Sequence, residues 1–388
     1  VPPGTPKEAP LTGRLPVGFK DLYPGRDPGV RDRLTTTRGN PRPEEAVMAA
    51  LRWLKKNQRA DGSWPRNAIA MTGLATLTFL AHGEVPGRNS PEFGETVQRA
   101  VEYLVGAQGA DGRIGASYAH AIAAYALCEA YGMTRNPNVK DAADRAVHVL
   151  VTGQNPAGGW DYGLVPSERD DTSVMGWCAQ ALKAAQLADA YRDRLALQAA
   201  LRKAVQGFRK NHQPGGGFGY TGPGAGGLSG VGTLCLQFLG AGGSREVRDT
   251  LVLMDAWPPA FRAEEAAALG GSVQYYYYYA TQAFFHDGGR RWNRWHERIW
   301  PLYVNAQKIE KDACTDPRGR PRNIGWWENG DAHSDRPVMD TCLAALQLMV
   351  YYRNLQTART EAVREEPAVR AAAAAVGPDD IPVEIGTL

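Results

Sequence analysis

A twelve-residue stretch of this chain occurs twice, and this internal repeat limits the fold more than any other feature. Residues 171–182 read Asp-Thr-Ser-Val-Met-Gly-Trp-Cys-Ala-Gln-Ala-Leu, and residues 335–346 read Asp-Arg-Pro-Val-Met-Asp-Thr-Cys-Leu-Ala-Ala-Leu. The two stretches agree at both ends and at Val-Met, Cys and Ala. Self-similarity at a period of tens of residues is typical of repeat architectures, so the match sets the register in which the other segments are aligned.

Six segments share this register and carry small or apolar residues around most of a helix, so they are predicted to form buried inner helices. They are 68–77, 117–127, 171–182, 228–239, 274–284 and 335–346. Their spacing of about 45 to 62 residues indicates one helical hairpin per unit. Amphipathic segments precede five of them and are predicted to form outer helices. These are 45–57, 95–107, 142–153, 197–211 and 292–308.

Buried inner helices and amphipathic outer helices in six hairpins predict an all-α fold, a closed (α/α)6 toroid, because closure hides both ends of the array. A helical solenoid is the alternative, but it needs polar caps at its ends, and neither terminal unit shows one. We expect three parts: a Pro-rich N-terminal arm at 1–43, the toroid at 44–356 and a C-terminal tail at 357–388. The fifth unit has no clear outer helix, and residues 257–271 are hard to place.

A glycine-rich turn that ends in an aromatic or apolar residue joins the two helices of most units. The turns are 58–64, 108–114, 154–160 and 213–218, and a stretched sixth version runs from 307 to 327. Glycine permits the positive backbone angles of a tight reversal. We expect the glutamine that opens each turn to hydrogen-bond the turn backbone, and the tryptophan to pack over a helix end.

The pattern Gln-x-x-x-Gly-x-Trp at 58–64 and 154–160 resembles the Gln-Trp repeats of squalene-hopene cyclases and their relatives, the terpenoid cyclase and prenyltransferase toroids. The resemblance covers the whole repeat region. It is strongest to the single-toroid bacterial proteins described as squalene cyclase or prenyltransferase repeat proteins. It implies the toroid fold but leaves the activity open, because one fold hosts many functions.

Residues 168–172, Glu-Arg-Asp-Asp-Thr, resemble the Asp-x-Asp-Asp-Thr motif with which class II terpene cyclases protonate an alkene or epoxide. Such an acid must stay neutral, which an apolar pocket with neighbouring carboxyls favours. The resemblance implies Asp170 as the acid and Asp171 as its neighbour, with Glu168 where the family has Asp.

The repeat offers another interpretation of this motif. Asp171 and Asp335 begin inner helices at the same register, and both are predicted N-caps, whose carboxylate accepts a bond from an unpaired backbone N–H. Three further residues of N-cap type lie within one residue of this position in other units: Ser117, Ser229 and Asn67. The repeat does not explain Asp170, which is either a loop acid near a helix N-terminus or the proton donor.

Aromatic residues are the candidates for lining a central ligand cavity. Five consecutive tyrosines at 275–279 point all round a helix, so only some can reach the axis of the toroid and the others must pack between helices. Such side chains could line an apolar pocket whose hydroxyls orient a ligand, or they could form plain core. The candidates are His120, Trp177, Tyr275, Tyr276, Tyr279, Trp326 and Trp327.

No metal or cofactor is predicted. Asp340 and Cys342 resemble the Asp-x-Cys zinc ligands of protein prenyltransferases, but no histidine follows them. Cys178, Cys235 and Cys342 also share one repeat position, filled elsewhere by glycine or alanine, which indicates a packing slot for a small residue. The polar loop 328–335 does not have the spacing of a calcium loop.

The composition of the chain indicates which kinds of partner it can bind. The formal net charge of +3 gives no footprint for nucleic acid, and no apolar run approaches the ~20 residues of a transmembrane helix. The two arms cannot bury enough apolar surface to order themselves, so we expect a protein partner or self-association through them. The Pro-rich start favours an exported chain, periplasmic or extracellular, although no signal segment is visible and the compartment stays open.

These observations favour a binding or scaffold subunit of a larger assembly, with an apolar, isoprenoid-like ligand or a protein partner. The alternative is a class II, protonation-initiated isoprenoid cyclase that uses Asp170 as its acid. Whether the chain is an enzyme is not decided by the sequence.

Overall fold

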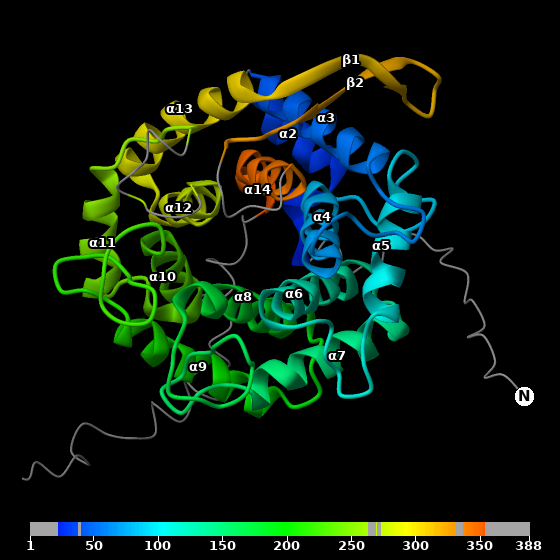
Figure 1. The fold of residues 1–388 in the computed structure, drawn as a ribbon. Coiled ribbons are helices and arrows are strands. Elements are labelled where there is room, and N and C mark those ends of the chain that lie inside the picture. The colour runs from blue at the N-terminus through cyan, green and yellow to red at the C-terminus, as the bar shows by residue number, and fades with distance from the viewer. Residues whose placement is uncertain (1–21, 38–39, 263–268, 270–272, 331–336, 354–388) are drawn as a thin grey trace, which may run out of the picture.

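Two concentric rings of helices make up the fold (Figure 1). The computed structural model describes residues 22–37, 40–262, 269, 273–330 and 337–353. In these residues the outer ring consists of α3 (Arg42–Lys56), α5 (Gly94–Gly106), α7 (Pro137–Thr152), α9 (Arg194–Lys210), α11 (Arg245–Asp255) and α13 (Gly289–Ala306). The inner ring consists of α4 (Ala68–His82), α6 (Ser117–Thr134), α8 (Thr172–Ala188), α10 (Ser229–Leu236), α12 (Val273–Asp287) and α14 (Val338–Leu348).

The inner ring is closed. Each inner helix packs against the next in chain order, and the last, α14, packs against the first, α4. In the outer ring α13 likewise contacts α3. The predicted all-α (α/α)6 toroid is therefore confirmed, and α11 supplies the fifth outer helix that the sequence pattern did not show. The predicted domain boundaries stay a prediction.

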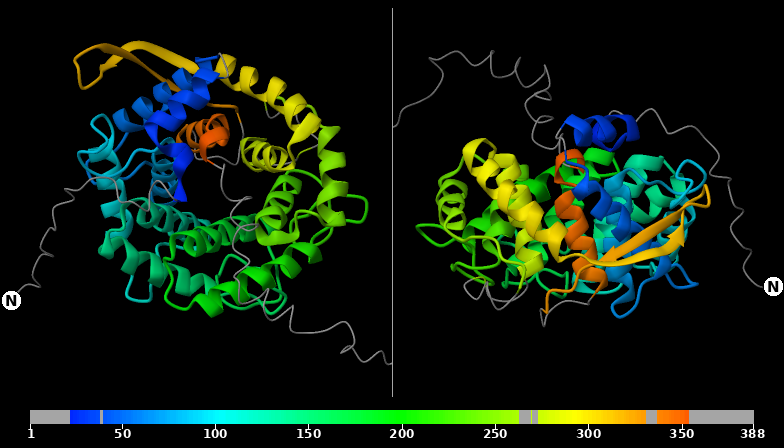
Figure 2. Two further views of the ribbon diagram at one scale, coloured as in Figure 1. Left: turned by 180° about the vertical axis from the view of Figure 1, so that it is seen from behind. Right: turned by 90° about the horizontal axis from the view of Figure 1, so that it is seen from above.

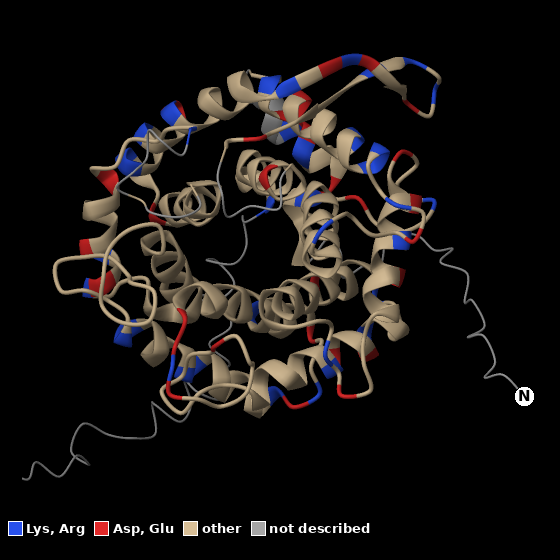
Figure 3. Ribbon diagram, in the orientation of Figure 1, with Lys and Arg blue, Asp and Glu red and all other residues tan. Residues whose placement is uncertain are grey.

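Burial separates the two rings as the sequence pattern indicated. On α3 one face is buried through Val47, Leu51 and Leu54, whereas Glu44 stands in the first turn and Lys55 in the last, each where it complements the helix dipole. On the inner helix α4 every residue from Ala70 to His82 is buried. Charged residues accordingly gather on the outer helices and the loops (Figure 3).

The glutamines of the first three turns each connect two units. Gln154 Nε2 donates to the carbonyl of Gly158 in its own turn at 2.8 Å and to the carbonyl of Ala200 on the next outer helix at 2.9 Å. Gln58 and Gln108 make the same pair of bonds, to Gly62 and Thr96 and to Gly112 and Ala142 respectively. The expected bond to the turn is confirmed for these three glutamines but not for Gln213, whose side chain is exposed. The second bond shows that the motif also joins neighbouring units.

The tryptophan and the glycine of the turn also have specific structural roles. Trp160 is fully buried, and its Nε1 donates to the carbonyl of Leu150 at the end of the preceding helix, at 2.7 Å. Gly158 has φ +105°, and a Cβ there would lie 2.0 Å from the carbonyl oxygen of Lys203. Only glycine satisfies both the backbone angle and the close approach of the next outer helix.

A β-hairpin replaces the turn in the sixth unit. Strands β1 (Lys308–Thr315) and β2 (Pro321–Trp326) pair antiparallel with an irregularity between Glu310 and Cys314. The ends of the turn are unchanged: Gln307 Nε2 donates to the carbonyl of Ala46 on α3, and Trp327 Nε1 to that of Tyr303, both at 2.8 Å. The hairpin is therefore an insertion into a regular turn, and the sequence did not predict its strands.

The predicted N-cap at Asp171 is confirmed, and of the three other residues of N-cap type only Asn67 caps its helix. Asp171 caps α8 by accepting from the backbone N–H of Ser173 and Val174, and Asn67 caps α4. Ser117 does not cap α6, because it is itself the first helical residue and the N-cap is Ala116. Ser229 does not cap α10, because its hydroxyl accepts from Phe218 N and Gly226 N and so holds the preceding loop. Asp335 lies outside the described residues.

Short helices cover the end of the toroid where the inner helices finish (Figure 2). They are the 3-10 helix η1 (Pro24–Arg26), α2 (Pro28–Thr37) and α15 (Val350–Arg353). Arg26 Nη1 forms a buried ion pair with Glu129 at 2.9 Å and donates to the carbonyl of Leu80. Part of the predicted N-terminal arm thus packs on the toroid.

Candidate functional site

A pocket of about 640 Å³, which we call the mouth pocket, lies where the inner helices begin. Its walls come from the first turns of α4, α6, α8, α12 and α14 and from the loop before α10. This volume suits a small molecule. The described lining residues are Asn67, Ala70, Met71, Leu74, Tyr118, Ile122, Tyr162, Ser173, Trp177, Phe218, Gly219, Tyr220, Ala225, Gly226, Gly227, Leu228, Leu269, Tyr275 and Met339.

Apolar and aromatic side chains dominate this lining. The Trp177 ring is 2% exposed and stacks on Tyr278, with 5.6 Å between ring centroids. Met71, Leu74 and Ile122 add buried aliphatic surface from two neighbouring helices. None of the described lining residues is charged, so the pocket favours an uncharged, apolar group.

Three tyrosine hydroxyls form the polar part of the pocket. Tyr118 OH lies 3.3 Å from Tyr162 OH, which in turn hydrogen-bonds Tyr220 OH. The Arg169 guanidinium lies over the rings of Tyr162 and Tyr220, at 5.3 and 5.5 Å from their centroids. Burial raises the pKa of Tyr118 and of Tyr220, so both remain neutral hydroxyls that can donate or accept.

A hydrogen-bonded network continues from the pocket along the inner helices. Ser173 Oγ donates to Tyr275 OH at 3.1 Å, and Tyr275 OH also lies 3.4 Å from Tyr279 OH. Gln180 joins Tyr279 to Tyr278, at 2.8 and 3.0 Å. The network reaches the far end of the toroid, where Arg353 Nη2 donates to the hydroxyls of Tyr278 and Tyr125. It fixes the orientation of the side chains beneath the pocket.

Asp171 lies directly behind the tyrosine rim. Its carboxylate is fully buried, accepts the two N-cap bonds and lies 3.2 Å from Arg169 Nη2. Burial raises its pKa, although the N-cap bonds and a hydrogen bond with Tyr220 oppose this effect. Asp171 therefore does not line the pocket itself but contacts two residues that do, Ser173 and Tyr220.

Asp170 does not line the mouth pocket. Its side chain is fully buried, with Asn155 Nδ2 and Lys210 Nζ each 2.8 Å from one of its oxygens. Gly159 packs against the carboxyl so closely that a Cβ there would lie 2.3 Å from Asp170 Oδ1. Glu168 is exposed on the surface. The three carboxylates of the motif therefore have separate environments and do not meet around one ligand position.

The structure places two of the seven candidate cavity residues, Trp177 and Tyr275, in the lining of the mouth pocket. Tyr279 lies behind it, bonded to Gln180 and Tyr275. Tyr276 instead packs edge-on against Trp257, on the side of α12 away from the described pocket. The run of tyrosines is thus divided between pocket, network and core, as the helical geometry required.

Three candidates belong to the walls between the rings. Both His120 nitrogens bond backbone, Nδ1 to Ile114 N and Nε2 to the Ala146 carbonyl, and burial lowers its pKa to about 4. Trp326 stacks on Trp53 of the outer helix α3. Trp327 occupies the buried turn position of the sixth unit. None of these three residues lines the mouth pocket, and their cavity role stays a prediction.

Sequence reasoning missed the three rim tyrosines. Tyr118 follows the register position that starts an inner helix, so alignment of the units could have found it. Tyr162 and Tyr220 lie just beyond the turns 154–160 and 213–218, at matching places in successive units. A single aromatic residue in a loop does not by itself indicate a binding site. Only alignment of the repeat units shows that Tyr162 and Tyr220 occupy equivalent positions.

No group of three or more potential metal ligands occurs within the described residues. Cys178, Cys235 and Cys342 are free and fully buried, and burial raises the pKa of the Cys342 thiol to about 12. These thiols are thus neutral packing residues. Most of the loop 328–335 lies outside the described residues.

Solved structures share this fold. The type II terpene cyclase MstE from Scytonema, in complex with its product merosterolic acid A, is 13% identical with a TM-score of 0.52, over 80% of this chain and 97% of that chain. The same cyclase in complex with its substrate geranylgeranyl dihydroxybenzoate is 12% identical, with a TM-score of 0.52, over 80% and 97%. An inactive variant of an α-1,6-mannanase of Salegentibacter, in complex with α-1,6-mannotriose, is 12% identical with a TM-score of 0.54, over 80% and 98%.

These likenesses define the fold: the chain is an (α/α)6 toroid, an architecture that it shares with the terpene cyclase and the mannanase, and the resemblance inferred from its turns is confirmed for the fold. No protein-family model and no curated protein matches the chain. Within the described residues no helix is long and apolar enough to span a membrane.

Proposed function

We propose that this toroid is a binding or scaffold subunit whose mouth pocket holds an apolar, isoprenoid-like ligand. The observation that carries the proposal is the pocket lining: its described residues are aromatic, aliphatic or neutral, with hydroxyls gathered at one rim. An apolar chain or ring would lie against Trp177, Leu74 and Ile122. A hydroxyl or carbonyl of the ligand would bond the rim tyrosines.

The fold also supports this ligand class, because a protein of the same architecture has been solved with geranylgeranyl dihydroxybenzoate, a molecule with an isoprenoid chain and a polar ring. The mannanase relative, solved with a trisaccharide, shows that the architecture also holds sugars. The absence of charge in the described lining favours the apolar ligand over a sugar, which requires many polar partners.

The alternative is a protonation-initiated isoprenoid cyclase. Asp170, its predicted acid, is ion-paired with Lys210 and does not face the pocket. The observation that favours this second candidate is Asp171. Its carboxyl is buried, its pKa is raised, and its hydrogen bond to Tyr220 connects an acid to the lining of the pocket.

A binding titration tests the proposal. Geranylgeraniol, added to the purified full-length protein, should quench tryptophan fluorescence in a saturable way, because Trp177 lines the pocket. A Tyr162→Ala/Tyr220→Ala variant should bind about tenfold more weakly, since each loses apolar contact and a hydroxyl. Leu195→Ala, at a site 78% exposed on the outer helix α9, is the matched control and should bind as the wild type does.

Mass spectrometry of the extracted ligand separates the two candidates. Recovery of unchanged geranylgeraniol supports a binding protein. A cyclised isomer that forms with wild type, but not with Asp170→Asn or Asp171→Asn, would show the enzyme instead. No saturable binding by the wild type would refute the proposed ligand class.

A further inference from the structure

The β-hairpin of the sixth unit is an addition that the fold does not require. In three other units the whole turn, from the glutamine to the residue that ends it, has only seven residues. The sixth unit keeps both end contacts, Gln307 to Ala46 and Trp327 to Tyr303, yet extends two strands between them. Insertions on a rigid scaffold are common carriers of function.

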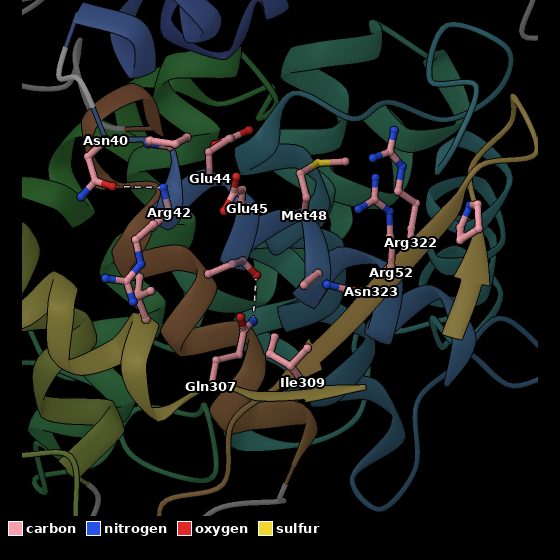
Figure 4. Close-up of a pocket in the computed structure, with 15 residues that line it drawn as sticks. Asn40, Arg42, Glu44, Glu45, Met48, Arg52, Gln307, Ile309, Arg322 and Asn323 are labelled. Atoms are coloured by element: carbon pink, nitrogen blue, oxygen red, sulfur yellow. Dashed lines mark hydrogen bonds between the residues drawn. The ribbon is translucent and has the colours of Figure 1, made fainter. Parts of the chain in front are cut away.

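The hairpin bounds a groove of about 930 Å³, which we call the hairpin groove (Figure 4). Its other walls are α3 and the end of α13. In this view Arg52 and Arg322 lie at the right, Met48 lies to their left, and Ile309 lies next to Gln307. The groove residues are 40–42, 44–46, 48, 49, 52, 304, 307, 309 and 321–323.

The groove lining carries Arg42, Arg52 and Arg322 against Glu44 and Glu45, and the segments on either side of it are more basic. Residues 52–59 and 308–322 contain nine Lys and Arg against three Asp and Glu, although the whole chain has a net charge of only +3. The Ile309 side chain is 46% exposed. Such a surface suits an extended segment that combines carboxylates with apolar side chains.

We propose that the hairpin groove binds residues 379–385 of the same chain, Asp-Asp-Ile-Pro-Val-Glu-Ile. In an extended conformation Ile381, Val383 and Ile385 share one face, because side chains alternate along the backbone. The segment carries three carboxylates and no basic residue. Its apolar face matches Met48 and Ile309. Its carboxylates would bond Arg52 and Arg322, which in the structure are paired with Glu92 and Asp316, so docking would exchange or share these ion pairs.

The point where the described chain ends supports delivery within one molecule. Tyr352 OH donates to Glu44 Oε2 at 3.0 Å, and Glu44 lines the groove. Residues 354–378 separate this point from the segment, and any chain of 25 residues can extend up to roughly 80–90 Å. From Glu44 to Arg52 the helix advances only about 12 Å, so the segment can reach the whole groove.

A segment bound there would span the seam at which the ring closes. At this seam Arg42 Nη2 of the first unit donates to Asn305 Oδ1 of the last unit at 2.7 Å, and Gln307 donates to Ala46. The occupant would contact α3 on one side and the hairpin on the other. It therefore joins the first and last units of the toroid.

Photo-cross-linking of the full chain tests this docking. With p-benzoylphenylalanine in place of Val383, irradiation should give a product of monomer mass in which position 383 is joined to α3 or β1. A product found only at dimer mass would assign the groove to a second copy and overturn the proposal. So would the absence of any cross-link to α3 or β1.

Charge reversals supply the matched comparison. Asp379→Lys/Asp380→Lys/Glu384→Lys should abolish the cross-link, whereas Glu361→Lys/Glu365→Lys/Glu366→Lys, with the same change in net charge, should retain it. Equal loss in both variants would show that overall charge, not this segment, controls the contact, and would refute the proposal. Both sets lie outside the toroid helices, and circular dichroism checks that the fold is intact.

Discussion

Replacing Gln154 by leucine tests whether the turn glutamines hold neighbouring units together. The side chain is buried, and its Nε2 makes two bonds, to the carbonyls of Gly158 and Ala200. A buried hydrogen bond contributes about 0.5–1.5 kcal/mol net. Loss of both therefore predicts that Gln154→Leu lowers the free energy of unfolding by about 1–3 kcal/mol.

The chain offers a close control for this substitution. Gln213 lies one residue beyond the corresponding position of the fourth unit, which His212 occupies, and its side chain is exposed and makes none of the hydrogen bonds described for the residues of the structure. Gln213→Leu should change stability by less than about 0.5 kcal/mol. Urea unfolding followed by circular dichroism measures both variants, and equal losses would refute the role assigned to the buried glutamines.

Three further perturbations follow from the fold. Gly158→Ala should lower the free energy of unfolding by more than about 1 kcal/mol, because its Cβ would meet the Lys203 carbonyl. Gly215→Ala, where φ is also positive but the surrounding space is open, should lower it less, and thermal unfolding compares the two variants. Asp171→Ala should cost about 1 kcal/mol through the lost N-cap, whereas Ser117→Ala should be nearly neutral in the same assay. Burial lowers the pKa of His82, but hydrogen bonds to Glu44 and Glu84 outweigh it, so the pKa is raised. The stability that protonated His82 adds is thus fully present below pH 6.5 and lost as pH rises through the higher folded pKa; a pH series of unfolding free energies should show this decline in the wild type and not in His82→Asn.

The repeat made the fold predictable because most units carry the same pattern of buried, amphipathic and turn residues. The Asp-to-Leu stretches fixed the register of the inner helices, and the Gln-Gly-Trp turns fixed the reversals between them. The hairpin was not predictable in the same way, since β1 is almost wholly exposed and shows no regular burial alternation. Likewise α11 was missed because no Gln-Trp turn follows it to mark the fifth unit.

The candidate site was predicted only in part. Trp177 and Tyr275 lie at register positions near the start of inner helices, where side chains face the pocket. His120 sits close to the same register but turns outward to backbone groups, and sequence spacing cannot distinguish these directions. Asp170 stood outside the repeat pattern, and its role became visible only with Lys210 and Asn155, which are distant in sequence.

Mass spectrometry of the lipid that the purified full-length protein retains tests the central claim most directly. The claim is that the mouth pocket holds an apolar, isoprenoid-like ligand and returns it unchanged. The account predicts a bound isoprenoid-like lipid in extracts of the wild type that is depleted in the Tyr162→Ala/Tyr220→Ala variant and present in Leu195→Ala. An extract without such a lipid, or one with equal lipid from all three proteins, would contradict it.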